Sequence, residues 1–435
     1  MPLLRLSFAN ALSLPILCFL LSGALSRVLL DSDAEMDAEL NGLAINENTG
    51  RCSHLLMRQE WRTLSDAHKA EYIRAVKCTR TLPKITSYRG VQSRFDDFQA
   101  VHIHTAASIH WAGHFLPWHR RFVTLYEKTL RDECGFRGAI PYWDWTQDVA
   151  GNKSQAHKTP NFDNKLIRTS PVFDPVTGFG GDGVKGTYTL PGNITAASQV
   201  LPSTFGGCVM DGPFGYNASD PNSFAVHVGP GKLVTTHCLV RGIDDSYKRF
   251  LSADVVKHAL EQQTYEQFRL ALEGGVDDDD SKSEESQHER EEAVPDNDST
   301  PVSEHASGHM VVGGELGNLY SSPGEPLFFL HHANLDRIWW NWQVMDLDRR
   351  LIDMSGNIVS SNPHENSTQD MDLDTGTGEE QDDDDGEYDG IDSSQLNASS
   401  TVTLDVSLRF GPLGRKIPIR DIMDITSFPS CYLYV

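Results

Sequence analysis

The spacing of apolar residues predicts a chain built mainly of helices. In the first third, apolar residues recur at helical intervals over residues 55–78 and 94–109. Another helix is expected from near Pro117 to about Arg131, because proline is well tolerated in a first helical turn. The aromatic run Pro141–Trp145 that follows has the composition of a buried core segment.

The second half of the chain repeats this helical pattern and then changes. Helical spacing returns over residues 253–272 and ends at the pair Gly274-Gly275. A further helix is predicted over residues 331–347. Residues 401–410 and 424–435 alternate between apolar and polar positions, which is typical of strands.

Between these halves, residues 150–240 are rich in glycine, proline, serine and threonine and have no sustained period. This composition predicts long loops with short strands. No internal repeat is visible. The pattern as a whole favours one mainly α-helical domain with long loops and a few short strands.

The first 26 residues have the features of a secretory signal peptide. Arg5 is followed by the apolar stretch Ala11–Leu21, and small residues stand at Ala24 and Ser26, near the expected cleavage site. A membrane anchor would need about 20 apolar residues, and this stretch is shorter and contains Pro15. The mature chain is therefore expected to begin near residue 27 and to be secreted.

Cysteines and glycosylation sequons agree with secretion. Apart from Cys18 in the signal, six cysteines predict three disulfides. Short local loops favour Cys52–Cys78 and Cys208–Cys238, which leaves Cys134–Cys431. Sequons for N-glycosylation start at Asn152, Asn193, Asn217, Asn297, Asn366 and Asn397.

The formal net charge of −24 is concentrated in two acidic segments. Residues 277–292 hold nine acidic and two basic residues, and residues 370–392 hold twelve acidic residues and no basic one. Such runs repel themselves and stay solvated, so we expect disordered insertions at about 276–300 and 366–396. No basic patch indicates nucleic-acid binding.

Two blocks of histidines carry the candidate chemistry. The first block contains His102, His104, His110, His114 and His119, and the second contains His305, His309, His331 and His332. Three imidazoles from each block would bind one metal ion, and all-imidazole ligation suits copper. The pair His305 and His309 lies one helical turn apart, but the zinc-protease pattern His-Glu-x-x-His is not met. Asp336, one turn after His332, is expected to orient an imidazole.

These residues carry a family resemblance. The run from His110 through Phe115-Leu-Pro-Trp-His119 to Glu127 resembles the copper-A signature of tyrosinases. The run from Pro326 through His331-His332 to Asp336 resembles their copper-B signature. The likeness spans roughly residues 50–435 and is greatest to the short secreted catechol oxidases and tyrosinases of filamentous fungi, which lack a C-terminal shielding domain.

The resemblance implies a tyrosinase-like helical bundle around a pair of copper ions, in a copper-binding domain over residues 27–435. It selects one set of ligands for each metal: His102, His110 and His119 for copper A, and His305, His309 and His332 for copper B. His104 and His114 then become neighbours or surface residues, and His331 becomes a supporting residue.

Two departures from the family pattern bear on the substrate. Ser108 stands where many fungal members have a cysteine that is cross-linked to a ligand, so that thioether should be absent. Ala306 stands where several efficient monophenol hydroxylases have asparagine. Both positions neighbour the ligands, and Ala306 favours diphenol oxidation over hydroxylation of tyrosine.

The resemblance thus implies oxidation of o-diphenols to o-quinones by dioxygen, with variable monophenol hydroxylation. A second hypothesis is a tailoring enzyme that oxidises tyrosine residues of a secreted peptide in a secondary-metabolite pathway. A third, from another functional class, is an oxygen carrier like the hemocyanins. The expected partners are dioxygen and a phenolic molecule or peptide tyrosine, with neither nucleic acid nor, after signal cleavage, a membrane.

Overall fold

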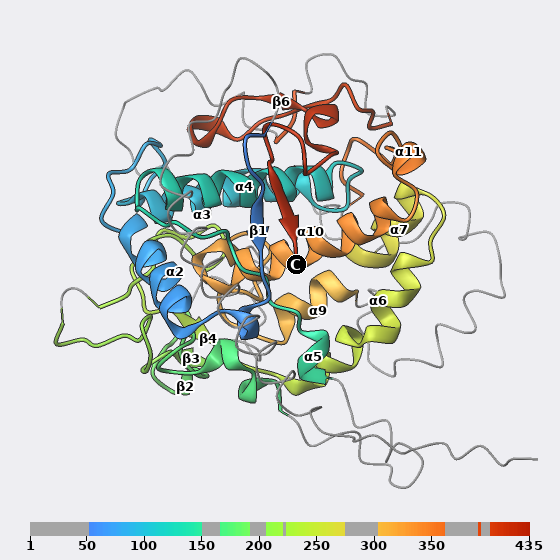
Figure 1. Ribbon diagram of the computed structural model, residues 1–435. Coiled ribbons are helices and arrows are strands. Elements are labelled where there is room, and N and C mark those ends of the chain that lie inside the picture. The colour runs from blue at the N-terminus through green and yellow to red at the C-terminus, as the bar shows by residue number, and fades with distance from the viewer. Residues whose placement is uncertain are drawn as a thin grey trace, which may run out of the picture. The chain divides into compact units, whose positions relative to one another are not determined.

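The computed structural model describes residues 52–149, 166–191, 206–220, 223–274, 303–361, 390–392 and 401–435. Helices dominate this part of the chain, as the apolar spacing predicts (Figure 1). The helices are α2 (Asp66–Thr79), α3 (Arg94–Ile109), α4 (Phe115–Asp132), α5 (Thr146–Val149), α6 (Ala253–Leu260), α7 (Tyr265–Glu273), α9 (Glu304–Met310), α10 (Leu327–Val344) and α11 (Leu347–Arg350).

The strands are short and form small sheets outside the helical core. They are β1 (Leu56–Arg58), β2 (Val184–Lys185), β3 (Gly207–Cys208), β4 (Val240–Arg241), β5 (Ser407–Leu408), β6 (Ile417–Pro418) and β7 (Tyr432–Tyr434). β1 pairs in parallel with β7, β3 lies between β2 and β4, and β5 pairs with β6. Contacts group Leu55–Val435 into one unit.

Several predicted helices have the expected position but different ends. α3 begins where expected because Ser93 and Asp96 form a capping box at its start. The helix expected over residues 55–78 begins only at Asp66, since Ser65 caps it and the preceding residues pair with β7 instead. The segment 253–272 is divided into α6 and α7, because Thr264 starts a second capping box.

The strands near the end of the chain are shorter than the alternation predicts. Within residues 401–410 only Ser407–Leu408 forms a strand, and within 424–435 only Tyr432–Tyr434. The helix expected over 331–347 begins earlier, at Leu327, and ends at Val344.

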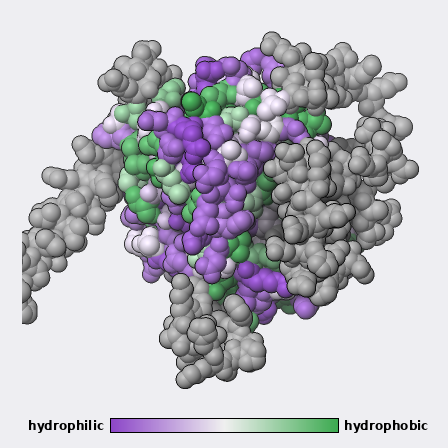
Figure 2. Space-filling model, turned by 90° about the vertical axis from the view of Figure 1, so that its right-hand side faces the viewer, coloured by the Kyte–Doolittle hydropathy of each residue, from purple (hydrophilic) through white to green (hydrophobic). Residues whose placement is uncertain are grey.

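The core lies where α4 packs against α10 (Figure 1). Tyr126 of α4 stacks on Phe329 of α10 with 3.5 Å between the ring centroids, and Phe122 stacks on the same ring. Both helices are buried along most of their length, so apolar burial fixes their mutual position. On the face seen in Figure 2, hydrophilic residues cover most of the coloured surface and hydrophobic residues form separate patches. In the part of the chain with described coordinates, no helix has both the length and the apolar character needed to span a membrane.

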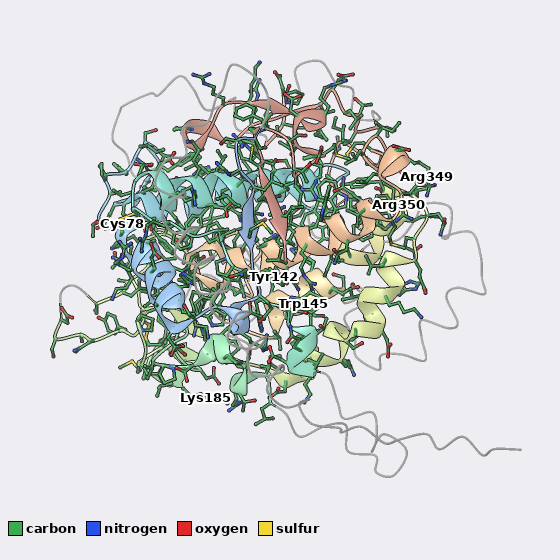
Figure 3. All side chains as sticks on the ribbon, in the orientation of Figure 1. Cys78, Tyr142, Trp145, Lys185, Arg349 and Arg350 are labelled. Carbon is green, nitrogen blue, oxygen red and sulfur yellow. A yellow bond between two sulfur atoms is a disulfide. The ribbon has the colours of Figure 1, made fainter. Side chains whose placement is uncertain are left out.

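The disulfides correct one predicted pairing. Cys208 is joined to Cys238 as expected, but Cys78 is joined to Cys134 across 56 residues. The predicted pairs Cys52–Cys78 and Cys134–Cys431 are therefore wrong. The cause is tertiary: α2 packs on α4, so the end of α2, where Cys78 lies (Figure 3), meets the residues that follow α4. Cys52 and Cys431 are also disulfide-bonded.

Some expectations fall on residues outside the described part. These are the signal peptide at 1–26, all but residues 390–392 of the two acidic insertions, and the sequons other than that of Asn217. Asn217 itself is exposed at the surface.

A buried ionic group ties the C-terminal strand to α4 and α10. Asp336 of α10 accepts hydrogen bonds from Tyr432 and Tyr434, each at 2.6 Å, and pairs with Arg58 and Arg120. Arg120 follows His119 directly on α4. The three charged members and Tyr432 are almost completely buried, so each charge depends on its partners for solvation.

We predict that Asp336→Ala lowers the free energy of unfolding by about 3–5 kcal/mol, because it leaves two buried guanidinium groups with fewer partners. Asp346→Ala provides the control, since the Asp346–Arg349 pair is about half exposed and should contribute less than about 1 kcal/mol. Urea unfolding of the metal-free proteins measures both. Equal losses for the two variants would contradict a central role for Asp336.

Candidate metal centre

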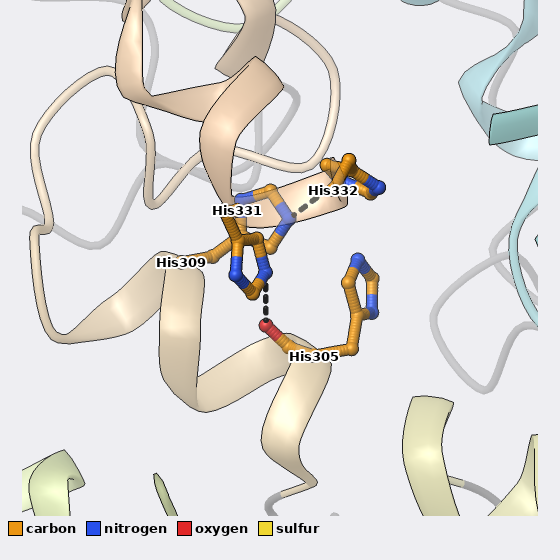
Figure 4. Close-up of side chains that lie close together, drawn as sticks. All are labelled: His305, His309, His331 and His332. Atoms are coloured by element: carbon orange, nitrogen blue, oxygen red, sulfur yellow. Dashed lines mark hydrogen bonds between the residues drawn. The ribbon is translucent and has the colours of Figure 1, made fainter. Parts of the chain in front are cut away.

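The predicted histidines lie on four helices that meet in the core. His102 is on α3, His110 directly follows α3, and His119 is on α4. His305 and His309 lie one turn apart on α9, and His331 and His332 are in the first half of α10 (Figure 4).

The side chains form two clusters. Within each cluster, the atoms that could bind a metal ion all lie within 4.8 Å of one another. One cluster contains His102, His110 and His119. The other contains His305, His309, His331 and His332. The remaining histidines of the two blocks lie outside both clusters: His104 is exposed and stacks on Tyr88, and His114 is buried at the start of α4.

The two clusters face each other. The rings of His119 and His332 stack at 4.5 Å with an interplanar angle of 15°, and those of His110 and His305 lie 5.8 Å apart at 17°. Phe115 packs against histidines of both clusters, with its ring 4.8 Å from His119 and 4.7 Å from His305. The clusters are therefore halves of one centre.

Backbone carbonyls hold one nitrogen of four of these imidazoles. The Nδ1 atom lies 2.7 Å from the Tyr320 carbonyl oxygen in His102, 2.8 Å from that of Ala106 in His110, 2.9 Å from that of Phe115 in His119, and 2.8 Å from that of Leu316 in His309. A carbonyl only accepts, so Nδ1 carries the hydrogen. In a neutral ring the lone pair then lies on Nε2.

Three of the Nε2 atoms have no protein partner. Those of His102, His119 and His305 are buried and make no hydrogen bond, while the Nε2 atoms of His309 and His332 lie 3.2 Å apart. Buried polar atoms in native proteins normally have partners. Orphaned lone pairs that converge in this way fit a metal ion as the missing partner.

His331 differs from the other members of its cluster. The Trp145 indole N–H donates to Nδ1 of His331 at 3.2 Å, and Nε2 of His331 lies 3.2 Å from the carbonyl oxygen of His305 (Figure 4). The indole can only donate and the carbonyl can only accept, so Nε2 carries the hydrogen and no lone pair is free. His331 therefore supports α9 against α10, whereas His332 has no such bonds and faces the other cluster.

Burial keeps these imidazoles neutral. Burial, with a contribution from neighbouring imidazoles, lowers the pKa of His110 to about 3, and burial lowers the pKa of His309 to about 4. Burial lowers the pKa values of His102, His119, His305 and His332 well below the ordinary value, again with a contribution from neighbouring imidazoles. Neutral rings are the form that binds metal.

Asp336 does not orient an imidazole, contrary to the expectation. Its carboxylate is occupied by the arginines and tyrosines described above, and Nδ1 of His332 makes no hydrogen bond. Ser108 donates to the carbonyl of Thr105, and Ala306 lies half-buried in the first turn of α9.

Two kinds of supporting group escape detection from the sequence. Trp145, on the chain leading into α5 (Figure 3), belongs to a run interpreted as core, and it is both buried and bonded to His331. The carbonyls of Leu316 and Tyr320 have no residue-type signal, because every residue has a carbonyl.

We predict that the metal-free protein loses stability as pH falls below about 6.5. Imidazoles with an ordinary pKa of about 6.5 in the unfolded chain bind protons there, while the buried rings stay neutral until the pH approaches their lowered values. Each such group adds a slope of up to about 1.4 kcal/mol per pH unit. Urea unfolding between pH 7 and 4.5 measures the slope.

His114→Phe is the matched variant for this measurement. Burial lowers the pKa of His114 to about 4, yet this histidine lies in neither cluster. The variant should take up about one proton fewer on unfolding, which makes the dependence of stability on pH less steep, and it should leave metal binding intact. An unchanged slope would contradict the neutral state of His114.

Comparison with known proteins identifies the family. Residues 92–345 match the family described as the common central domain of tyrosinase. The tyrosinase-like protein phomQ1' of Diaporthe leptostromiformis is 33% identical over 331 residues, which cover 72% of this chain and 70% of that protein. N-acetyl-6-hydroxytryptophan oxidase ivoB of Emericella nidulans is 28% identical over 438 residues, covering 93% of this chain and 99% of that protein.

A solved structure extends the likeness to three dimensions. Polyphenol oxidase from Thermothelomyces thermophila, determined as a mutant, matches with a TM-score of 0.59 at 26% identity and covers 95% of both chains. The chain therefore belongs to the tyrosinase family of oxidoreductases and has the mainly helical fold of its polyphenol oxidases.

Proposed function

We propose that this protein binds two copper ions and oxidises o-diphenols to o-quinones with dioxygen, with a variable capacity to hydroxylate monophenols. The observation that carries the proposal is the pair of facing imidazole clusters, each with three rings available as ligands. His102, His110 and His119 would hold one ion, and His305, His309 and His332 the other.

The donor set fits copper. Imidazole nitrogen suits copper well, whereas hard cations prefer carboxylate and carbonyl oxygen. Among the described residues, neither cluster includes a carboxylate, so the ligands would add no negative charge. When bound, a copper pair supplies electron transfer from the phenolic substrate to dioxygen. Two o-diphenols each give up two electrons and two protons. One dioxygen takes up these four electrons and four protons and forms two waters.

The protein's own contribution is to hold the rings neutral, fix their positions and limit access of water. Phe115 and Phe328 provide apolar walls, with the Phe328 ring 4.1 Å from that of His332. Ala306 next to His305 offers no hydrogen-bonding side chain. A side chain that helps to remove a phenol proton would favour monophenols, so its absence at this position supports diphenols as the better substrates.

We further propose that the protein is secreted. The support is the signal-like sequence at residues 1–26, the disulfide-bonded cysteines and the exposed Asn217 sequon.

One relative favours a second candidate substrate class. The likeness to N-acetyl-6-hydroxytryptophan oxidase covers nearly the whole of both chains. It supports oxidation of a hydroxylated aromatic group in an amino-acid derivative, and a peptide tyrosine belongs to the same chemical class. This candidate function uses the same metal centre and differs only in the substrate that enters it.

A substrate panel separates these candidates. The copper-loaded protein is assayed with 4-methylcatechol, tyrosine, tyramine, a tyrosine-containing peptide and N-acetyl-6-hydroxytryptophan, with oxygen consumption as the readout. We expect 4-methylcatechol to be oxidised fastest. Hydroxylation of tyrosine at a similar rate would overturn the preference for diphenols, and reversible oxygen uptake without turnover would indicate an oxygen carrier.

Copper content tests the ligand assignment. His332→Asn should lose copper from one site and abolish oxidation, because it removes one of three ligands. His331→Asn is the neighbouring control and should retain both ions, since this ring has no free lone pair. Metal analysis of the purified proteins measures the number of ions per chain. Loss of copper from the His331 variant alone would reverse the assignment.

A further inference from the structure

One loop contacts a histidine of each cluster. We call residues 311–321, between α9 and α10, the bridging loop. Its Tyr320 carbonyl accepts from Nδ1 of His102, and its Leu316 carbonyl accepts from Nδ1 of His309, at 2.7 and 2.8 Å. His102 is on α3 and His309 on α9, so the loop is shared by the two clusters.

Close backbone packing fixes the path of this loop. Gly314 has a φ of +55°, and a Cβ atom there would lie 2.1 Å from the carbonyl oxygen of Val240. The next residue, Glu315, donates its backbone N–H to the same carbonyl at 2.9 Å. Farther along, the Asn318 side chain accepts the backbone N–H groups of Tyr320 and Ser321. The loop is therefore anchored on β4 at one end and folded on itself at the other.

The carboxylate of Glu315 connects this loop to two other segments. It is completely buried, and its two oxygens have different partners. Oε1 accepts from Nε2 of Gln99 at 3.0 Å, and Oε2 lies 3.1 Å from Nε2 of His237. Gln99 stands three residues before His102 on α3 and also donates to the Ser321 carbonyl at 3.0 Å. The Gln99 side chain thus joins α3, the helix of His102, to Glu315 and Ser321 of the loop.

The hydrogen-bond partners of His237 favour its positively charged form. Its Nδ1 lies 2.8 Å from the carbonyl oxygen of Thr235, and its Nε2 faces the Glu315 carboxylate. Both neighbours accept hydrogen bonds, so both ring nitrogens carry hydrogen. Burial opposes this charge, but the hydrogen bond and charge of Glu315 raise the pKa of His237 above its ordinary value. The ring of Tyr188 also packs on His237, at 5.6 Å.

We propose that the buried Glu315–His237 pair is a positioning device that sets the separation of the two metal sites through the bridging loop. Neither residue is a ligand. They act by fixing the carbonyls that orient His102 and His309, and so they determine where the Nε2 atoms of the two clusters point. This inference rests on the proposed function, because it concerns the spacing of two copper ions.

A merely structural role for the pair makes a different prediction. A buried ion pair that only stabilises the fold would lower the unfolding temperature when broken, without changing how the bound copper ions interact. The test therefore needs a readout of the metal pair itself. Two Cu(II) ions held close together couple and give no electron paramagnetic resonance signal, whereas a separated Cu(II) ion gives one.

The experiment compares full-length Glu315→Ala and Glu315→Gln with the wild type. Asp148→Ala is the control, because Asp148 is also a buried carboxylate, which pairs with Arg62 and accepts a hydrogen bond from the Trp143 indole. For each protein we measure the unfolding temperature without metal, the copper affinity and the fraction of copper visible by electron paramagnetic resonance.

For Glu315→Ala we expect copper affinity to fall about 10- to 100-fold, as is usual when groups that support ligands are removed, together with a large increase in visible copper. Glu315→Gln should restore the coupled pair, because an amide can accept from Gln99 and donate to a neutral His237. Asp148→Ala should lose thermal stability, but its bound copper should still give no electron paramagnetic resonance signal.

The outcomes separate this inference from the proposed function. If Glu315→Ala binds two silent copper ions as tightly as the wild type, the positioning role is overturned and the proposed function stands. If the wild type binds no coupled copper pair, the proposed function itself fails. Should Glu315→Ala not fold, Gln99→Leu cuts the link to α3 and should raise the visible copper fraction. Silent copper in that folded variant would also overturn the proposal.

Discussion

A buried imidazole can bind a metal ion only if one nitrogen has a free lone pair, and here the backbone decides which nitrogen that is. In four of the clustered histidines a carbonyl oxygen accepts a hydrogen bond from Nδ1–H, which directs Nε2 toward the centre. In His110 and His119 the carbonyl lies four residues earlier in the chain, so the anchoring is local. In His102 and His309 it comes from the loop between α9 and α10. The centre therefore depends on helix geometry and on one tertiary contact surface together.

Charge is arranged around the centre according to the same constraint. Two buried carboxylates near the centre, those of Asp336 and Glu315, have partners other than the clustered histidines. Asp336 is satisfied by arginines and tyrosines, and Glu315 by Gln99 and His237. Because these charges have fixed partners, they do not compete with the neutral imidazoles for a metal ion. The ligand set remains purely imidazole although acidic groups lie within the same core.

Local signals in the sequence predict what local interactions determine. The bounds of α3 follow from its capping box, and the pairing of His305 with His309 follows from their spacing on one helix turn. The choice between His331 and His332 does not follow from spacing, since Trp145, far away in the chain, occupies the ring of His331. The role of Asp336 is missed for the same reason. Its spacing places it one turn from His332, but its carboxylate accepts hydrogen bonds from tyrosines of β7, which is far away in the chain.

The pairing of β1 with β7 has a consequence for the order in which the protein folds. Arg58 and Tyr434 are 376 residues apart, yet they meet at Asp336 between the helices that carry the histidines. Until residues 432–434 have been synthesised, Arg58 lacks its Tyr434 partner and Asp336 lacks both tyrosine donors. Contacts of such long sequence separation form late and slowly. The core therefore reaches its final form only after synthesis of the chain through β7, so the junction beside the histidine-bearing helices is completed after translation.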